Sequence, residues 1–192
     1  MTKMAKKTGP RSIGALEVSS IGVGYKAQDA MLDAANIELL IARTICSGKY
    51  LIVYTGSVSD VNSAQAAGVA AADGALIDEL VIPAVHEGLF PAMGESVALT
   101  DEQVGALGIV ETFSGVSIIA AADAAAKAAR VTLFRIHLAM ALGGKGFCLM
   151  TGDIADVEAG VAAAGAEARQ RGLLVSEVVI PRPARELFSD YV

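Results

Sequence analysis

The stretch SGKYLIVYTGSVSDV at residues 47–61 recurs later in the chain as GGKGFCLMTGDIADV at residues 143–157. Both copies contain a Gly-Lys pair, an apolar run, a Thr-Gly pair and a closing Asp-Val, and they lie 96 residues apart. Self-similarity at a regular spacing is the signature of an internal repeat. The match therefore predicts that one structural unit occurs twice in this chain.

The repeat extends outward from these stretches in both directions. Residues 13–17 match 107–111 at an offset of 94, and residues 80–90 match 178–188 at an offset of 98. The rising offset indicates two small insertions in the second copy, one before its glycine run and one near residues 170–172. We predict a tandem duplication with a tail at 1–11, a first domain at 12–92, a linker at 93–104 and a second domain at 105–192.

Each copy reads as strand, helix, strand, strand, helix, strand. The apolar periodicity of the first copy predicts strands at 13–19, 37–45, 50–55 and 76–82, and helices at 25–36 and from Ser57 or Ser59 to about 73. A serine hydroxyl there would cap the second helix. The order favours an α/β fold, namely a compact α+β sandwich of two βαββαβ units related to the ferredoxin-like split βαβ arrangement.

Composition excludes several classes of function. Hydrophobic residues make up 54% of the chain, but none of the apolar runs approaches the roughly 20 residues of a membrane helix, so we expect a protein without a membrane span. The net charge of −6 and the absence of tryptophan argue against nucleic-acid binding. Two cysteines and two histidines, without HExxH or CxxC, predict neither a disulfide framework nor a conventional metal site and fit a reducing cytoplasm.

The run GGKG at residues 143–146 raises the question of a phosphate-binding loop. A P-loop requires a Ser or Thr after the lysine and a helix that opens there. Here Gly146 follows Lys145, and the next residues, FCLM, read as a buried strand. We therefore interpret the run as a turn between strands, where glycine permits positive φ and close backbone approach.

The repeated motifs carry a resemblance to a known family. The segments QDAMLDAAN (28–36), GGKGFCLMTGDIADV (143–157) and VIPRP (179–183) resemble those of bacterial microcompartment shell proteins. The doubled chain is similar to the tandem-domain, trimer-forming class, and its details to the PduT-type shell proteins of propanediol-utilisation compartments. The resemblance covers residues 12–190 and both copies.

The resemblance implies a structural protein and not an enzyme. It implies a homotrimer that forms a flat, pseudohexameric tile in the shell of a compartment within the cytoplasm. Other shell proteins would join at the tile edges, and encapsulated enzymes are further candidate partners. A central pore for small molecules would be surrounded by the turns between strands, at Cys46, Ser47, Gly48, Leu142, Gly143, Gly144, Lys145 and Gly146. Small residues suit turns that crowd around a symmetry axis.

In PduT-type proteins, the cysteine that follows the GGK run holds an iron–sulfur cluster on the threefold axis. The corresponding residue here is Gly146, which has no sulfur. We therefore predict that the chain holds no cofactor. Cys148 is interpreted as a small buried hydrophobic residue. Cys46, in the first-copy turn, is the alternative thiol if a metal is bound.

The resemblance also implies which residues lie at the tile edge. A helix lysine and the arginine of VIPRP make the contacts between tiles in single-domain relatives. The second copy has both, as Lys127 and Arg182, whereas the first copy has Asp33 and Ala84. A solvated helix face is the alternative interpretation of Lys127. The pairs Glu17 and Glu111, and His86 and His137, are interpreted as structural or ordinary surface residues.

Two other classes of function stay open from the sequence. One is a redox shell component that binds a metallocofactor through Cys46. The other is a signalling protein of the PII type, which also forms trimers of small α/β units. The PII type is disfavoured because no segment is long and polar enough to be its exposed loop.

Overall fold

The computed structural model describes residues 12–188, so the predicted tail at 1–11 and the last four residues lie outside the described part. The first domain contains four strands and two helices in the predicted order. They are β1 (Ser12–Val18), α1 (Ile21–Ala34), β2 (Glu38–Ile45), β3 (Lys49–Gly56), α2 (Val58–Ala72) and β4 (Leu76–Ile82).

The second domain repeats this order. Its elements are β5 (Ala106–Thr112), α4 (Gly115–Ala128), β6 (Thr132–Leu138), β7 (Gly146–Gly152), α5 (Ile154–Gln170) and β8 (Leu174–Ile180). Between the two domains, the segment predicted as a linker begins inside a short helix, α3 (Leu89–Met93). This helix packs against α4 and β6 of the second domain.

The two sheets have the same topology. Their strand orders are β2-β3-β1-β4 and β6-β7-β5-β8, and all neighbouring strands are antiparallel. The register is also repeated, because Ala15 pairs with Val53 in the first sheet and Ile109 pairs with Leu149 in the second. The predicted fold class, two tandem α/β units, is therefore confirmed.

Serine hydroxyls set the helix starts of the first domain. The Ser20 hydroxyl accepts a hydrogen bond from Val23 N at 3.4 Å, so α1 begins four residues before the predicted Tyr25. The prediction placed the start too late because Gly22 and Gly24 in this turn lower helix propensity without preventing the helix. Ser57, one of the two predicted N-caps, caps α2 by accepting from Asp60 N at 3.1 Å.

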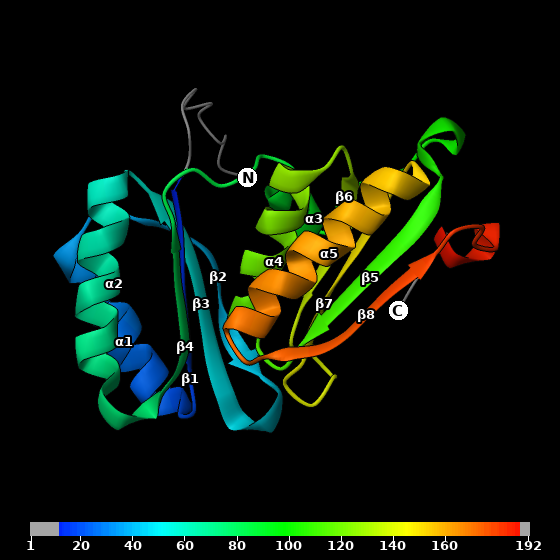
Figure 1. Cartoon of the computed structure of the whole chain (residues 1–192). Coiled ribbons are helices and arrows are strands. Elements are labelled where there is room, and N and C mark those ends of the chain that lie inside the picture. Colours follow the sequence, from blue (N-terminus) through cyan, green and yellow to red (C-terminus); the bar gives the residue numbers. More distant parts are fainter. Residues whose placement is uncertain (1–11, 189–192) are drawn as a thin grey trace.

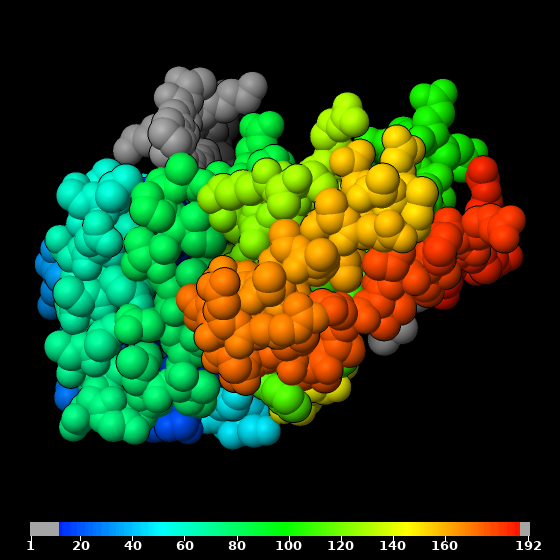
Figure 2. Space-filling model, in the orientation of Figure 1, coloured from blue at the N-terminus to red at the C-terminus, as the bar shows by residue number. Residues whose placement is uncertain are grey.

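The molecule is built from alternating layers (Figure 1). Helices α1 and α2 cover one face of the first sheet, α4 and α5 follow on its other face, and the second sheet lies beyond them. The two domains form one continuous body (Figure 2). Among the described residues, the helices are too short or too polar to cross a membrane.

Both faces of the first sheet are therefore buried, each in a different core. The face toward α1 and α2 contributes Leu16, Ile52 and Tyr54 to the core of the first domain. The opposite face contributes Ile13, Ala15, Leu51, Val53 and Leu80 to a core shared with Val116, Ile119 and Ala122 of α4. The second domain thus packs on the first through α4.

A buried carboxylate fixes this contact. Glu17 in β1 is fully buried, and its carboxylate accepts hydrogen bonds from Lys49 Nζ at 2.8 Å and from Gly115 N at 2.9 Å. Ser114 Oγ also lies 3.1 Å from the carboxylate and shares its single proton with the closer carboxylate of Asp78, at 2.6 Å. Gly115 is the first residue of α4, so the carboxylate interacts favourably with the positive end of the helix dipole.

A second acidic residue extends the contact between the domains. Asp78 in β4 accepts hydrogen bonds from Ser114 Oγ at 2.6 Å and Ser117 Oγ at 2.7 Å. Arg171 Nη1 completes the group at 2.8 Å from Asp78. Arg171 lies in the second insertion inferred from the repeat, and the counterpart of Asp78 in the second copy is Ser176. This ion pair is therefore a feature of the contact inside the chain.

We predict that Glu17→Gln lowers the free energy of unfolding by about 2–4 kcal/mol, because it leaves the Lys49 ammonium without a countercharge inside the contact. Urea unfolding followed by circular dichroism measures the change. The control is Glu158→Gln on the exposed face of α5, which should change stability by less than about 0.5 kcal/mol. Equal effects of the two substitutions would contradict the role given to Glu17.

Candidate functional site: pore turns and assembly faces

The structure brings the predicted pore residues of both copies to one end of the molecule. The β2–β3 turn (Cys46–Gly48) and the β6–β7 turn lie side by side at the lower end of Figure 1. Cys46 N donates a hydrogen bond to Ala139 O at 3.3 Å, which joins the two turns directly.

The glycines of the turns adopt the backbone conformation predicted for them. Gly48, Gly143 and Gly144 have φ values of 70°, 63° and 88°. Residues that carry a Cβ rarely adopt this left-handed backbone conformation. The longer second turn also holds Ala139 and Ala141 at positive φ, 57° and 58°.

Gly146 has a different reason to be glycine. A Cβ at this position would lie 2.7 Å from Ile118 Cγ2 and 3.1 Å from Ser114 O, so a side chain would point into the core of the second domain. Gly146 was predicted as a pore residue, but only its backbone could face a pore, because its Cβ direction leads into the core.

The lysines of the turns fold back onto their own sheets. Lys49 pairs with Glu17, and Lys145 pairs with Glu111, the counterpart of Glu17. The ammonium groups are thereby largely neutralised.

The two thiols differ in environment. Partial desolvation raises the pKa of Cys46, but backbone hydrogen bonds from residues 141–144 outweigh this effect and leave the pKa below its ordinary value. Cys148 is fully buried, and burial raises its pKa to about 12. The interpretation of Cys148 as a buried hydrophobic residue agrees with this environment, and Cys46 is the more reactive thiol of the two.

The residues do not fit an iron–sulfur cluster at the position that the resemblance implies. Gly146 offers no sulfur, and its Cβ direction leads into the core. Within residues 12–188, no group of three or more histidine, cysteine, aspartate or glutamate side chains is placed to hold a metal ion.

The residues expected at the tile edge lie on the surface in both domains. Arg182, Asp33 and Ala84 are exposed. The ammonium of Lys127 lies 2.5 Å from Asp123 Oδ2, and its side chain stays 44% exposed. Lys127 is thus both a partner of Asp123 and available at the surface.

Sequence reasoning missed the role of Asp123. Its side chain is nearly buried, and Oδ1 accepts a hydrogen bond from His86 N at 2.8 Å. His86 belongs to the end of the first copy, so this bond joins the two domains. The signal that could have shown it is the repeat itself, since the aspartate recurs as Asp29 in the first copy. The imidazole of His86 accepts from Gly88 N at 3.2 Å, as befits an ordinary structural residue.

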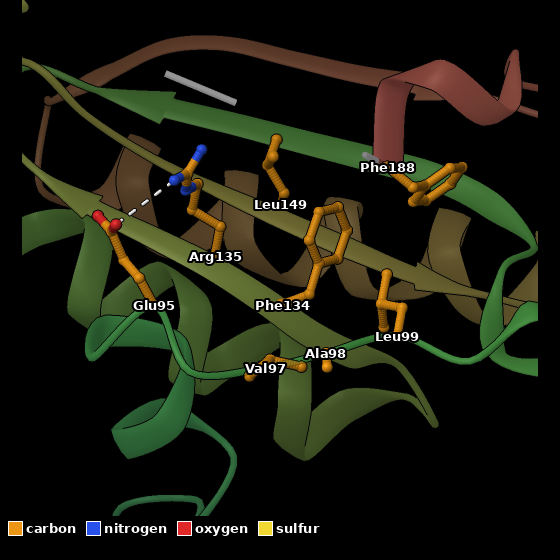
Figure 3. Close-up of a pocket in the computed structure, with 8 residues that line it drawn as sticks. All are labelled: Glu95, Val97, Ala98, Leu99, Phe134, Arg135, Leu149 and Phe188. Atoms are coloured by element: carbon orange, nitrogen blue, oxygen red, sulfur yellow. Dashed lines mark hydrogen bonds and ion pairs between the residues drawn. The ribbon is translucent and has the colours of Figure 1, made fainter. Parts of the chain in front are cut away.

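The outer face of the second sheet is uncovered, unlike that of the first. It carries a hollow of about 320 Å³ lined by residues 95 and 97–99 of the linker together with Phe134, Arg135, Leu149 and Phe188 (Figure 3). Arg135 and Glu95 form an ion pair of 3.4 Å at one side of the hollow, and Phe134 and Phe188 lie side by side at the other.

A second hollow of about 380 Å³ on the same face is mainly apolar. Its lining includes Leu107, Ile109, Phe147 and Ile180. His137 also lines it, with its ring stacked on Phe147 at 5.2 Å. Burial lowers the pKa of His137, the nearby Glu95 opposes this effect, and Arg135 and Arg43 add to it.

Comparison with known proteins agrees with this architecture. Residues 12–85 and 106–183 each match the BMC domain. The chain is 43% identical to the bacterial microcompartment shell protein PduT of Citrobacter freundii over 182 residues, which covers 95% of this chain and 98% of the relative.

Solved structures show the same fold. A microcompartment protein from Desulfitobacterium hafniense DCB superposes with a TM-score of 0.84 and 45% identity, covering 93% of this chain and 98% of that one. The fused permuted hexameric shell protein MSM0275 superposes with a TM-score of 0.62 at 18% identity, covering 83% and 82%, and shares the fold alone.

The family match confirms the predicted resemblance in both copies. Because proteins of this family build shells and do not catalyse reactions, it also confirms the prediction that the chain is not an enzyme. The chain therefore belongs to the BMC-domain family, as a tandem-domain, PduT-like shell protein of a bacterial microcompartment.

Proposed function

We propose that three copies of this chain close into a pseudohexameric shell tile whose central pore, lined by the β2–β3 and β6–β7 turns, passes small molecules. The observation that carries the proposal is the order of layers, helix, sheet, helix, sheet. Such a stack has a helix layer at one end and a bare sheet at the other. Inside the chain, helix α4 of the second domain packs on the sheet of the first domain. By the same packing, the helix layer α1–α2 of one copy could cover the bare second sheet of another copy.

The sheet end supports this reading residue by residue. Leu80 in the first sheet is 8% exposed because α4 covers it, whereas its counterpart Val178 in the second sheet is 43% exposed. The apolar hollow on the second sheet lies on this same face. Burial of this surface by another copy would be favourable by roughly 25 cal/mol per Å² of apolar area.

The helix end gives the matching half. Ile119 in α4 is fully buried against the first sheet, whereas its counterpart Tyr25 in α1 is 60% exposed. Ile21, at the first turn of α1, is also exposed and corresponds to the buried Gly115 of α4. Exposed apolar faces of this kind mark interaction surfaces.

Joining unlike ends is a heterologous contact, which produces a ring when the rotation closes. The contact inside the chain and the contact between chains would be equivalent, so three two-domain chains supply six positions in one ring. The trimer implied by the resemblance is the closed form of this arrangement. The turns of all six domains would then meet at one end of the ring.

Glu111 tests the contact between chains. Its carboxylate is 26% exposed and pairs with Lys145, as Glu17 pairs with Lys49. In the ring, it would accept hydrogen bonds from the Ile21 amide of the next chain, as Glu17 does from Gly115.

We predict that Glu111→Gln weakens each contact between chains by about 1.5–3 kcal/mol, which is roughly a tenfold to hundredfold loss of affinity. Sedimentation velocity over a dilution series measures the shift. The folded chain should keep its circular dichroism spectrum, and Glu158→Gln is the matched control. A parent protein that stays monomeric at all concentrations would refute the ring.

A further prediction concerns the tile edge. The double substitution Lys127→Ala, Arg182→Ala should leave the trimer intact but suppress extended layers. Exposed ion pairs contribute only about 0–1 kcal/mol each, but a layer repeats every contact many times. Electron microscopy under conditions in which the parent forms layers is the measurement. Asp33→Asn at the first-copy counterpart is the control, and layers formed equally by the double variant would exclude these residues from the edge.

The second candidate function is a redox shell component that binds metal through Cys46. It is favoured by one observation, the lowered pKa of an accessible thiol in the turn. The preferred structural function predicts that protein purified without oxygen contains no stoichiometric iron, with the same visible absorbance for the parent and Cys46→Ser. Iron in the parent that is lost in Cys46→Ser would establish the redox alternative. Cys148→Ser serves as the control for the buried thiol.

A further inference from the structure

The segment that follows the last strand of the first copy reaches across to the second domain. His86 N donates to Asp123 Oδ1 at 2.8 Å, and Leu89 is fully buried where α3 packs on α4 and β6. A turn in which Leu89 N donates to His86 O at 3.1 Å holds the segment in shape. The end of the first copy thus binds the second domain through one hydrogen bond and one buried leucine.

The corresponding segment of the second copy contacts its own domain, through Phe188 on Phe134, and the linker, through an Arg185–Asp101 ion pair of 3.0 Å. Residues 181–188, the segment that we term the hook, form the same turn, with Leu187 N donating to Ala184 O at 3.1 Å. Leu187 is the counterpart of Leu89, but it is 45% exposed and lies at the rim of the apolar hollow on the second sheet. Phe188 packs on Phe134 with ring centroids 5.7 Å apart, which holds the hook against its own sheet.

Helix α1 carries a surface to which the hook could bind. Asp29 is the counterpart of Asp123 and is exposed. Leu32 is the counterpart of Ala126, and it is 44% exposed, compared with 8% for the alanine. An aspartate and an apolar side chain one turn apart on α1 thus stand at the positions that Asp123, which accepts from His86 N, and Ala126 occupy on α4.

The hook and α1 lie at opposite ends of the chain (Figure 1), so they cannot meet within one copy. We propose that the hook binds α1 of the next copy, with the Asp29 carboxylate accepting the Ala184 N–H and Leu187 packing against Leu32. This inference rests on the proposed ring and deepens it, because it names the segment that closes each contact between chains. The occupant is a second copy, since the same contact already exists between the two domains of one chain.

The first test is Leu187→Ser. The side chain is exposed in the single chain, so the fold should be unchanged by circular dichroism, whereas the dissociation constant of the trimer should rise about tenfold or more. Ile154→Ser is the matched control, since Ile154 is similarly exposed, at 41%, but lies on α5. Sedimentation velocity over a dilution series gives both values, and equal effects of the two substitutions would overturn the hook.

The second test is chemical cross-linking. Asp29→Cys and Ala184→Cys are combined in a Cys46→Ser background and treated with a short thiol-specific cross-linker. The proposal expects linked species of two and three chains under denaturing conditions, and none from a variant that carries only one of the two introduced cysteines beside the buried Cys148. A combined variant that is trimeric but gives no linked chains would overturn the hook and leave the ring standing. A monomeric parent would overturn both.

Discussion

The buried carboxylate of Glu17 is the contact on which the arrangement of this molecule depends. A charge in the interior is costly unless it has a countercharge and its hydrogen-bonding capacity is met. Lys49, from the first domain, supplies the countercharge, and the start of α4, from the second domain, supplies an amide and a hydroxyl. The carboxylate is therefore satisfied only when the domains are docked. Docking places α4 on the outer face of the first sheet, and the layer order follows.

The two copies differ at this contact. The first copy has Asp78, which meets two serines of the second domain and Arg171. The second copy has Ser176 there, whose hydroxyl donates to Glu111 within its own domain. The first copy thus has an ion pair at a position where the second copy has only a hydroxyl–carboxylate hydrogen bond.

The two turns between strands differ in length but share their main features. Both turns fold their lysine back onto a glutamate, and both use left-handed glycines. The longer second turn surrounds Cys46 with backbone amides. The direction of the Gly146 Cβ explains why packing under Ile118 requires glycine at that position.

The sequence by itself determined the duplication, the fold class and the order of elements, because turn chemistry and hydrophobic periodicity are local. It predicted β4 at 76–82 as observed, and Ser57 was one of the two residues that it proposed as the cap of α2. It placed the start of α1 too late, because the cap at Ser20 outweighs two unfavourable glycines. The glutamates were correctly interpreted as structural, although their partners were not foreseen.

Only the tertiary structure decided which faces of the two sheets are covered and which are bare. Two strands with the same pattern, one buried at Leu80 and the other open at Val178, cannot be told apart by periodicity. It also decided that Arg171 reaches Asp78 and that Gly146 faces the core. These contacts join residues far apart in the chain, and their geometry exists only after the two domains have packed against each other.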